Sequence, residues 1–126
     1  MVAYSFQKRF APMIEAGLKT HTIRGERKRH ARVGERLQLY RGMRTKYCAK
    51  IISDPICNLV EPIHIRFAAD SGLILSINLF DEEMPDLDAF AISDGFDDAA
   101  EMARFWATQH GQMDEFCGWL IGWLPK

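Results

Sequence analysis

The chain has 126 residues, of which 48% are hydrophobic and 26% charged, the composition of a soluble globular protein. Its length fits one domain, and no segment reaches the ~18 apolar residues of a membrane-spanning helix. The formal net charge is only −1, but residues 1–50 hold 13 Lys and Arg against 3 acids, whereas residues 51–126 hold 3 against 14. This asymmetry indicates a polyanionic partner, unless the two halves fold on each other and neutralise their charges.

The first half of the chain is predicted to be mainly strands. Phe10, Met13 and Ile14 recur at helical spacing before Gly17, which indicates one short helix. β-Branched residues and an alternating pattern indicate strands on both sides of a basic loop. In chain order we expect a strand at residues 2–6, a helix at 9–16, and strands at 20–24, 36–40 and 45–53.

The second half combines strands with two helices. The acids of residues 81–85 are predicted to open a helical region, since acids favour helix starts. The best helix spans residues 97–110, with Asp97 or Asp98 as its cap and Gly111 as its stop. Its apolar stripe consists of Ala99, Met102, Phe105 and Trp106. The other predicted elements are strands at 63–68 and 73–78, a helix at 87–93 and a strand at 116–123. The pattern predicts one α+β domain over residues 1–126, whose strands can close into a small barrel.

The stretch from Gly17 to Arg24, GLKTHTIR, carries the strongest chemical signal. Alternate residues of a strand share a face, so Thr22 and Arg24 point the same way, and Lys19 can curl back toward the Thr22 hydroxyl. An amine beside a hydroxyl can act as its base when burial or nearby cations lower the amine's pKa. A guanidinium offers fixed donors for a carbonyl, carboxylate or phosphate oxygen. The same letters also fit an edge strand with solvated charges.

The octet resembles the G-x-K-x-x-T-x-R signature of the ASCH family, whose fold is similar to the PUA domain. The similarity extends to the preceding helix (Phe10, Ile14), to GERLQL at residues 34–39, to DGF at 94–96 and to FCGWLIGW at 116–123. The resemblance implies a PUA-like small β-barrel with flanking helices and a cleft beside the strand that carries Lys19 and Thr22.

Family members are associated with RNA or modified nucleosides. Short bacterial members are amidohydrolases that remove the acetyl group of N4-acetylcytidine, and others are reported as ribonucleases. The resemblance implies catalytic roles for Lys19, Thr22 and Arg24, while the glutamate of the deacetylating members falls most nearly on Asp94. It implies no cofactor.

A second set of candidates is basic and is expected to contact phosphates. It consists of Arg27, Lys28, Arg29, Arg32, Arg41, Arg44 and Lys46. The alternative is an ordinary solvated loop. Tyr40 or Tyr47 can stack on a base, although strand tyrosines often only pack. Trp119 and Trp123 alternate with glycines, which either leave a slot for a flat ring or permit a bend.

The cysteines and the N-terminus indicate the compartment. Cys48, Cys57 and Cys117 show neither a disulfide framework nor a zinc-ligand spacing, so no metal site is expected. The first residues have charges after apolar residues, the wrong order for a secretory signal. We therefore expect a cytoplasmic protein with reduced thiols.

Two classes of function follow. The first is a hydrolase, most directly an amidohydrolase acting on an N4-acylated cytidine, and the second is a module that binds RNA with the same basic face. A ribonuclease stands between them. A nucleoside enzyme needs a small closed pocket at Thr22, whereas an RNA-binding protein needs an open groove continuous with residues 27–46.

Overall fold

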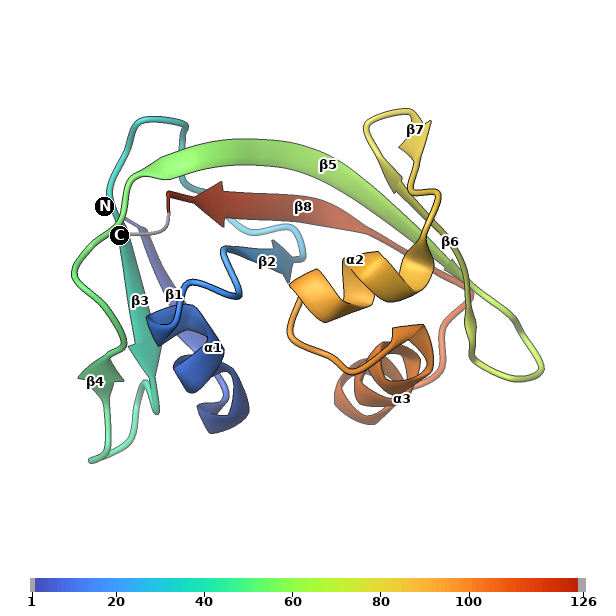
Figure 1. Cartoon of the computed structure of the whole chain (residues 1–126), viewed down its shortest axis with the longest axis horizontal. Coiled ribbons are helices and arrows are strands. Elements are labelled where there is room, and N and C mark those ends of the chain that lie inside the picture. Colours follow the sequence, from blue (N-terminus) through green and yellow to red (C-terminus); the bar gives the residue numbers. More distant parts are fainter. Residues whose placement is uncertain (1, 125–126) are drawn as a thin grey trace.

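The computed structural model describes residues 2–124 and shows an α+β protein with two sheets (Figure 1). The five-stranded sheet has the order β2-β8-β5-β6-β7, and the three-stranded sheet the order β1-β3-β4. The elements are β1 (Val2–Phe6), a 3-10 turn η1 (Lys8–Phe10), α1 (Ala11–Glu15), β2 (His21–Arg24), β3 (Leu37–Arg41), β4 (Ala49–Lys50), β5 (Cys57–Phe67), β6 (Ile74–Leu79), β7 (Glu82–Glu83), α2 (Leu87–Ser93), α3 (Ala99–His110) and β8 (Glu115–Trp123). The α+β class expected from the sequence is confirmed.

The long antiparallel pair β5–β8 lies in the interior of the larger sheet. Alternate residues of β5, Ile63, Ile65 and Phe67, are buried on the face that the helices cover. On the other edge of β8, β2 pairs so that Thr22 lies opposite Ile121 and Arg24 opposite Trp119. Among the described strands, β2 is therefore an edge strand that pairs with β8 alone.

The two sheets are joined on one side by main-chain hydrogen bonds. Leu37 N–H donates to the Pro55 carbonyl and Cys57 N–H to the Glu35 carbonyl, each at 2.8 Å, around a bridge between Arg36 and Ile56. This places the start of β3 beside the start of β5. The strands of the two sheets thus follow one another in the order β2, β8, β5, β3 and β1, and we call this curved succession of strands the curl.

The curl does not close between its two ends. Within residues 2–124, no backbone ladder joins β1 to β2, and no closed barrel is found. The open line between these strands, which we call the seam, is bridged by side chains: Arg24 donates to the Ser5 carbonyl at 2.6 Å and Arg27 to the Ala3 carbonyl at 3.3 Å. The expected closure of the strands is therefore replaced by two guanidinium contacts.

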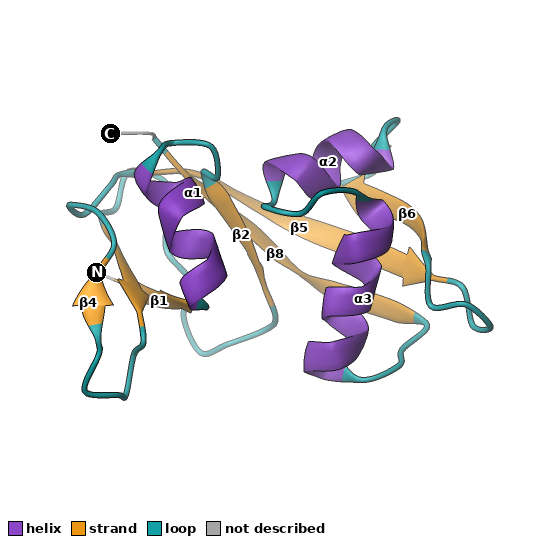
Figure 2. Cartoon of the chain, turned by 60° about the horizontal axis from the view of Figure 1, so that its bottom comes forward, coloured by secondary structure: helices purple, strands orange, loops and turns teal. Residues whose placement is uncertain are grey.

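The helices gather on one side of the strands. Both views place α2 and α3 against the five-stranded sheet and α1 nearer the three-stranded sheet (Figure 2). The side chain of Asp98 caps α3 by accepting from the Glu101 N–H, as the sequence predicts. Met102 and Trp106 are buried in the core, whereas Phe105 is only half-buried. In the described part of the chain, no helix has the length and apolar character to cross a membrane.

Two predicted elements are wrong. The expected strand at 45–53 is reduced to Ala49–Lys50, because the Thr45 hydroxyl and N–H both donate to the Gly42 carbonyl and fold residues 42–45 into a turn. The acids of 81–85 do not open a helix. Glu82 and Glu83 instead form β7 in a short hairpin with β6, and α2 begins only after the Asp86 cap.

Candidate functional site

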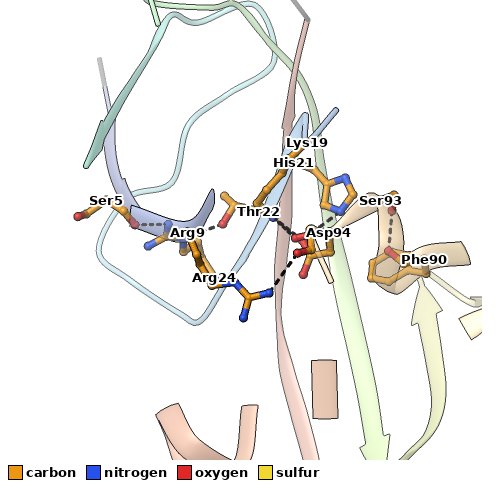
Figure 3. A network of polar contacts seen from close by, with 10 residues as sticks. Ser5, Arg9, Lys19, His21, Thr22, Arg24, Phe90, Ser93 and Asp94 are labelled. Atoms are coloured by element: carbon orange, nitrogen blue, oxygen red, sulfur yellow. Dashed lines mark hydrogen bonds and ion pairs between the residues drawn. The ribbon is translucent and has the colours of Figure 1, made fainter. Parts of the chain in front are cut away.

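A cleft of about 270 Å³ lies at the seam. Its walls come from β1, β2, η1, the loop after α2, the end of α3 and β8. Residues on these walls include Phe6, Lys19, Thr22, Arg24, Asp94 and Phe96. The four residues that sequence reasoning selected as catalytic therefore line one cavity, and Figure 3 shows them gathered around Asp94.

The turn after α1 directs Lys19 into this cleft. Gly17 has a φ of 76°, which ends the helix, and the N–H groups of Leu18 and Lys19 both donate to the Met13 carbonyl at 2.9 and 3.1 Å. The chain turns so sharply that Leu18 is exposed while the neighbouring Lys19 is only 4% exposed.

Asp94 meets Lys19 from the opposite side of the cleft. The Lys19 Nζ donates to the Asp94 Oδ1 and to its main-chain carbonyl, both at 2.7 Å. His21 Nε2 lies 3.2 Å from the same Oδ1. Asp94 is the C-cap of α2 and is followed by Gly95 with a φ of 103°, where a Cβ would come within about 3.0 Å of the Phe10 ring. Gly95 thus lets the chain turn tightly against Phe10 directly after Asp94, whose carboxylate contacts Lys19.

The electrostatics of this cluster are dominated by burial and by the attraction between Lys19 and Asp94. Burial lowers the pKa of Lys19, and the opposing attraction of Asp94 does not cancel this shift, since Arg24 and Arg9 also repel the ammonium. Burial alone raises the pKa of Asp94, but the charge of Lys19 and the contact with His21 outweigh it, so the net pKa is lowered. The site therefore holds a carboxylate beside an amine that gives up its proton more readily than usual.

Thr22 and Arg24 lie on one face of β2, as the alternation predicts. The Arg24 Nε donates to the Thr22 Oγ1 at 3.0 Å while its Nη2 donates to the Ser5 carbonyl. The guanidinium carbon also sits 4.9 Å from the centre of the Phe6 ring. Burial lowers the pKa of Arg24 to about 10, so the guanidinium remains charged at neutral pH.

The sequence analysis did not predict the partner of the Lys19 amine. It directed Lys19 toward the Thr22 hydroxyl, whereas the Asp94 carboxylate is the direct partner of Lys19. Among the described residues, the hydrogen bonds of the Lys19 ammonium run to Asp94, and the hydroxyl of Thr22 is bound by Arg24 instead. A separation of 75 positions between Lys19 and Asp94 gives no local signal for this contact.

Sequence reasoning also missed the aromatic wall of the cleft. Phe10, Phe96 and Phe105 pack edge-on or tilted with ring centres 5.1–5.6 Å apart. The Arg9 guanidinium lies 5.0–5.6 Å from all three rings and donates to Glu101 at 3.3 Å. Phe10 and Phe105 each belong to a set of apolar residues at helical spacing in the sequence. This spacing indicated a place in the core and not on the wall of a cavity.

The basic candidates of the loop after β2 lie outside the cleft lining. Arg27 covers the Tyr4 ring at 5.2 Å as well as binding the Ala3 carbonyl, and Arg29 forms an ion pair with Glu35. Arg32 donates its backbone N–H to Glu35 at 3.1 Å. Lys28 is exposed on the same loop. Much of this positive charge therefore serves contacts within the chain.

The other three candidates belong to a different place: Arg41 ends β3, and Arg44 and Lys46 lie in the turn between β3 and β4. A second hollow, of about 590 Å³, lies there and is lined by Arg41 and Tyr47 among others. Ser5, Phe6 and Gln7 line both this hollow and the cleft. The cleft is small but partly open to solvent, and the larger hollow beside it is lined by residues of the 41–47 segment and not by the basic loop at 27–32.

The tryptophan slot considered from the sequence is filled. A Cβ on Gly118 would lie 2.5 Å from the Arg24 carbonyl and from the Phe116 ring, so the space that the glycine leaves is already occupied. Trp123 is buried against Phe6, and Trp119 donates to Glu26 at 3.2 Å. Neither tryptophan lines the cleft.

One group of potential metal ligands lies on the outer face of the β5–β8 ladder. His64, Glu115 and Cys117 hold ligand atoms within 4.8 Å of one another, and His64 Nε2 pairs with Glu115 Oε2 at 3.0 Å. Glu115 and Cys117 are exposed, His64 is half-buried, and none of the three side chains lines the cleft. No family model, curated protein or solved structure matches this chain.

Proposed function

We propose that the protein is a cytoplasmic ASCH-family amidohydrolase with a PUA-like fold, which removes the acyl group of an N4-acylated cytidine. The observation that supports this proposal is the convergence of a buried amine, a buried carboxylate, a buried hydroxyl and a half-buried guanidinium on one cleft of about 270 Å³. That volume is close to the lower end of small-molecule sites, which start at ~300 Å³. The aromatic wall suits a flat pyrimidine ring.

Thr22 is the nucleophile in this scheme. Its Oγ1 attacks the amide carbonyl carbon while the hydroxyl proton passes to the neutral amine of Lys19. The Arg24 Nε already donates to Oγ1, which occupies an oxygen lone pair and leaves the hydroxyl hydrogen free for Lys19. The remaining donors of Arg24 stabilise the oxyanion that forms on the acyl oxygen.

The tetrahedral intermediate collapses when the Lys19 ammonium returns its proton to N4. The C–N bond breaks, cytidine leaves with a free amino group, and the acyl group remains as an ester on Thr22. Water then gives a proton to the neutral Lys19 and attacks the ester. The Lys19 ammonium returns this proton to the departing Thr22 Oγ1, and a carboxylic acid is released. Asp94 holds the amine in place throughout, because its Oδ1 and carbonyl both accept from Nζ.

The proposal is tested by measuring, with chromatography, the release of cytidine from N4-acetylcytidine. Thr22→Ala and Lys19→Met are expected to abolish turnover in folded protein, whereas Thr22→Ser retains part of it. Turnover in the wild type is expected to rise with pH through the pKa of Lys19, which lies below its ordinary value of 10.5. Lys50→Ala, which removes an exposed cation outside the cleft lining, is the matched control. Full turnover by Thr22→Ala excludes the threonine as nucleophile.

A second candidate function, RNA binding with or without strand cleavage, is favoured by one observation. The larger hollow at residues 41–47 shares a wall with the cleft and is lined by cations. A nucleoside alone has no use for it.

A further inference from the structure

The cleft and the second hollow form adjoining parts of one surface. Ser5, Phe6 and Gln7 stand between them and line both. The volumes are about 270 and 590 Å³, so a nucleoside that fills the cleft leaves the larger space empty. A ligand that occupies both must extend over Gln7, away from the reacting group.

The second hollow carries positive charge with no acidic counterpart. Lys8 and Arg41 line it, and Arg44 and Lys46 belong to the same turn. In the described part of the chain, no acidic side chain lines this hollow, and none forms an ion pair with these four residues. Arg29, by contrast, is paired with Glu35. These cations are available to a phosphate backbone.

An aromatic ring stands beside these charges. Tyr47 is 68% exposed, and the Lys46 Nζ lies 5.3 Å from the centre of its ring. The turn that presents it is well held: Thr45 Oγ1 donates to the Gly42 carbonyl at 2.6 Å and accepts from the Tyr47 N–H at 3.1 Å. Gly42 has a φ of 64°, and a Cβ there would lie 3.1 Å from the Tyr47 carbonyl. The backbone of the turn is therefore held in place and presents the Tyr47 ring to solvent.

Exposed aromatic rings flanked by cations are the usual elements of single-strand binding surfaces, where bases stack and phosphates are neutralised. We propose that the substrate is an acylated cytidine within single-stranded RNA, whose neighbouring nucleotide occupies the second hollow and stacks on Tyr47 while Arg41 contacts its phosphate. This inference rests on the proposed function, which it deepens by naming a strand rather than a free nucleoside as the substrate.

The ratio of two specificity constants tests the inference. We compare kcat/KM for a hexaribonucleotide that contains one N4-acetylcytidine with kcat/KM for free N4-acetylcytidine. Wild-type protein is expected to prefer the strand at least tenfold. Tyr47→Ala and Arg41→Ala each reduce this preference at least about fivefold, the lower limit for the loss of one stacked base or a comparable contact. Tyr47→Phe, which keeps the ring, and Lys50→Ala, which removes a cation outside the hollow, preserve it.

Binding measured without turnover separates the two proposals. Anisotropy of a labelled, unmodified hexaribonucleotide is followed with Thr22→Ala protein and with the Thr22→Ala, Tyr47→Ala double variant. Weaker binding by the double variant supports the second hollow, even where no acylated substrate reacts and the amidohydrolase proposal fails. Hydrolysis of the free nucleoside at the same kcat/KM as the strand overturns the strand inference while the amidohydrolase stands. Equal RNA affinity of the two variants overturns it as well.

Discussion

Two basic segments of similar sequence character have different surroundings in the folded protein. The first basic segment, residues 24–32, is tied to its own chain: Arg24 and Arg27 bind the main chain of β1, and Arg29 pairs with Glu35. The second basic segment, residues 41–47, borders a hollow and makes no ion pair among the described residues. The first segment therefore contributes to the fold, and the second offers its charge to a ligand.

This difference shows that the role of a run of cations depends on the groups that it contacts elsewhere in the chain. The carbonyls of Ala3 and Ser5 lie on an edge of β1 that has no neighbouring strand within residues 2–124. Guanidinium groups supply the donors that a strand would otherwise supply. This accounts for Arg24 and Arg27, two of the cations at and after the end of β2, the strand on the other side of the seam.

The largest effect on stability is expected for Arg24→Ala in the first basic segment. Its removal leaves the Ser5 carbonyl without its donor and strips the Phe6 ring of its cover, so we expect a loss of about 2–3 kcal/mol in the free energy of unfolding. Denaturant unfolding measures it. Arg24→Lys, which keeps the charge but not the planar fork, recovers only part of the loss. A wild-type midpoint for Arg24→Ala contradicts a structural role for this residue.

The second basic segment is expected to show the opposite behaviour. The triple variant Arg41→Ala, Arg44→Ala, Lys46→Ala changes the free energy of unfolding by no more than about 0.5 kcal/mol, since these side chains lie at the surface. Its affinity for single-stranded RNA falls, and the slope of log K against log salt decreases by ~2, from ~0.7 for each neutralised phosphate. Titrations at several salt concentrations measure the slope, and an unchanged slope removes this segment from the RNA surface.

A smaller effect is expected at Arg27. Its guanidinium is exposed and binds the Ala3 carbonyl at 3.3 Å, so Arg27→Ala costs about 0.5–1 kcal/mol of unfolding free energy. The salt slope for RNA is expected to change less than in the triple variant of the second segment. Chemical denaturation and RNA titration of the same preparation give both values. A larger change in slope than in the triple variant reverses the assignment of the two segments.

The smallest effect is expected at Arg29. The pair with Glu35 is exposed, and exposed pairs contribute little to stability. Arg29→Ala is therefore expected to leave the melting temperature unchanged, with Lys28→Ala as a neighbouring control. A clear drop in melting temperature for Arg29→Ala alone identifies this pair as a structural contact comparable to that of Arg27.

The sequence predicts those features that depend on near neighbours. The common face of Thr22 and Arg24 follows from strand alternation, and the start of α3 follows from the capping preference of Asp98. Features that depend on partners far apart in the sequence cannot be predicted in this way. Nothing near Lys19 indicates that Asp94 receives its ammonium, and the basic loop does not show which cations reach β1.

The failed strand at 45–53 has a local cause that residue preferences hide. Arg44 adopts a φ of 70°, an uncommon conformation for a residue with a side chain. The turn tolerates it because Thr45 binds Gly42 through both its hydroxyl and its N–H. Alternation of Tyr47 with its neighbours resembles a strand, yet these residues form the border of the second hollow.

The seam has a consequence for self-association. Edge strands such as β1 and β2 offer free main-chain groups on which another copy of the chain can add a strand and begin aggregation. Arg24 and Arg27 already occupy the Ser5 and Ala3 carbonyls of β1 and place positive charge along that edge. A second copy would have to displace both guanidinium groups and approach like charges. The same contacts that bridge the seam thus protect the protein from intermolecular sheet formation.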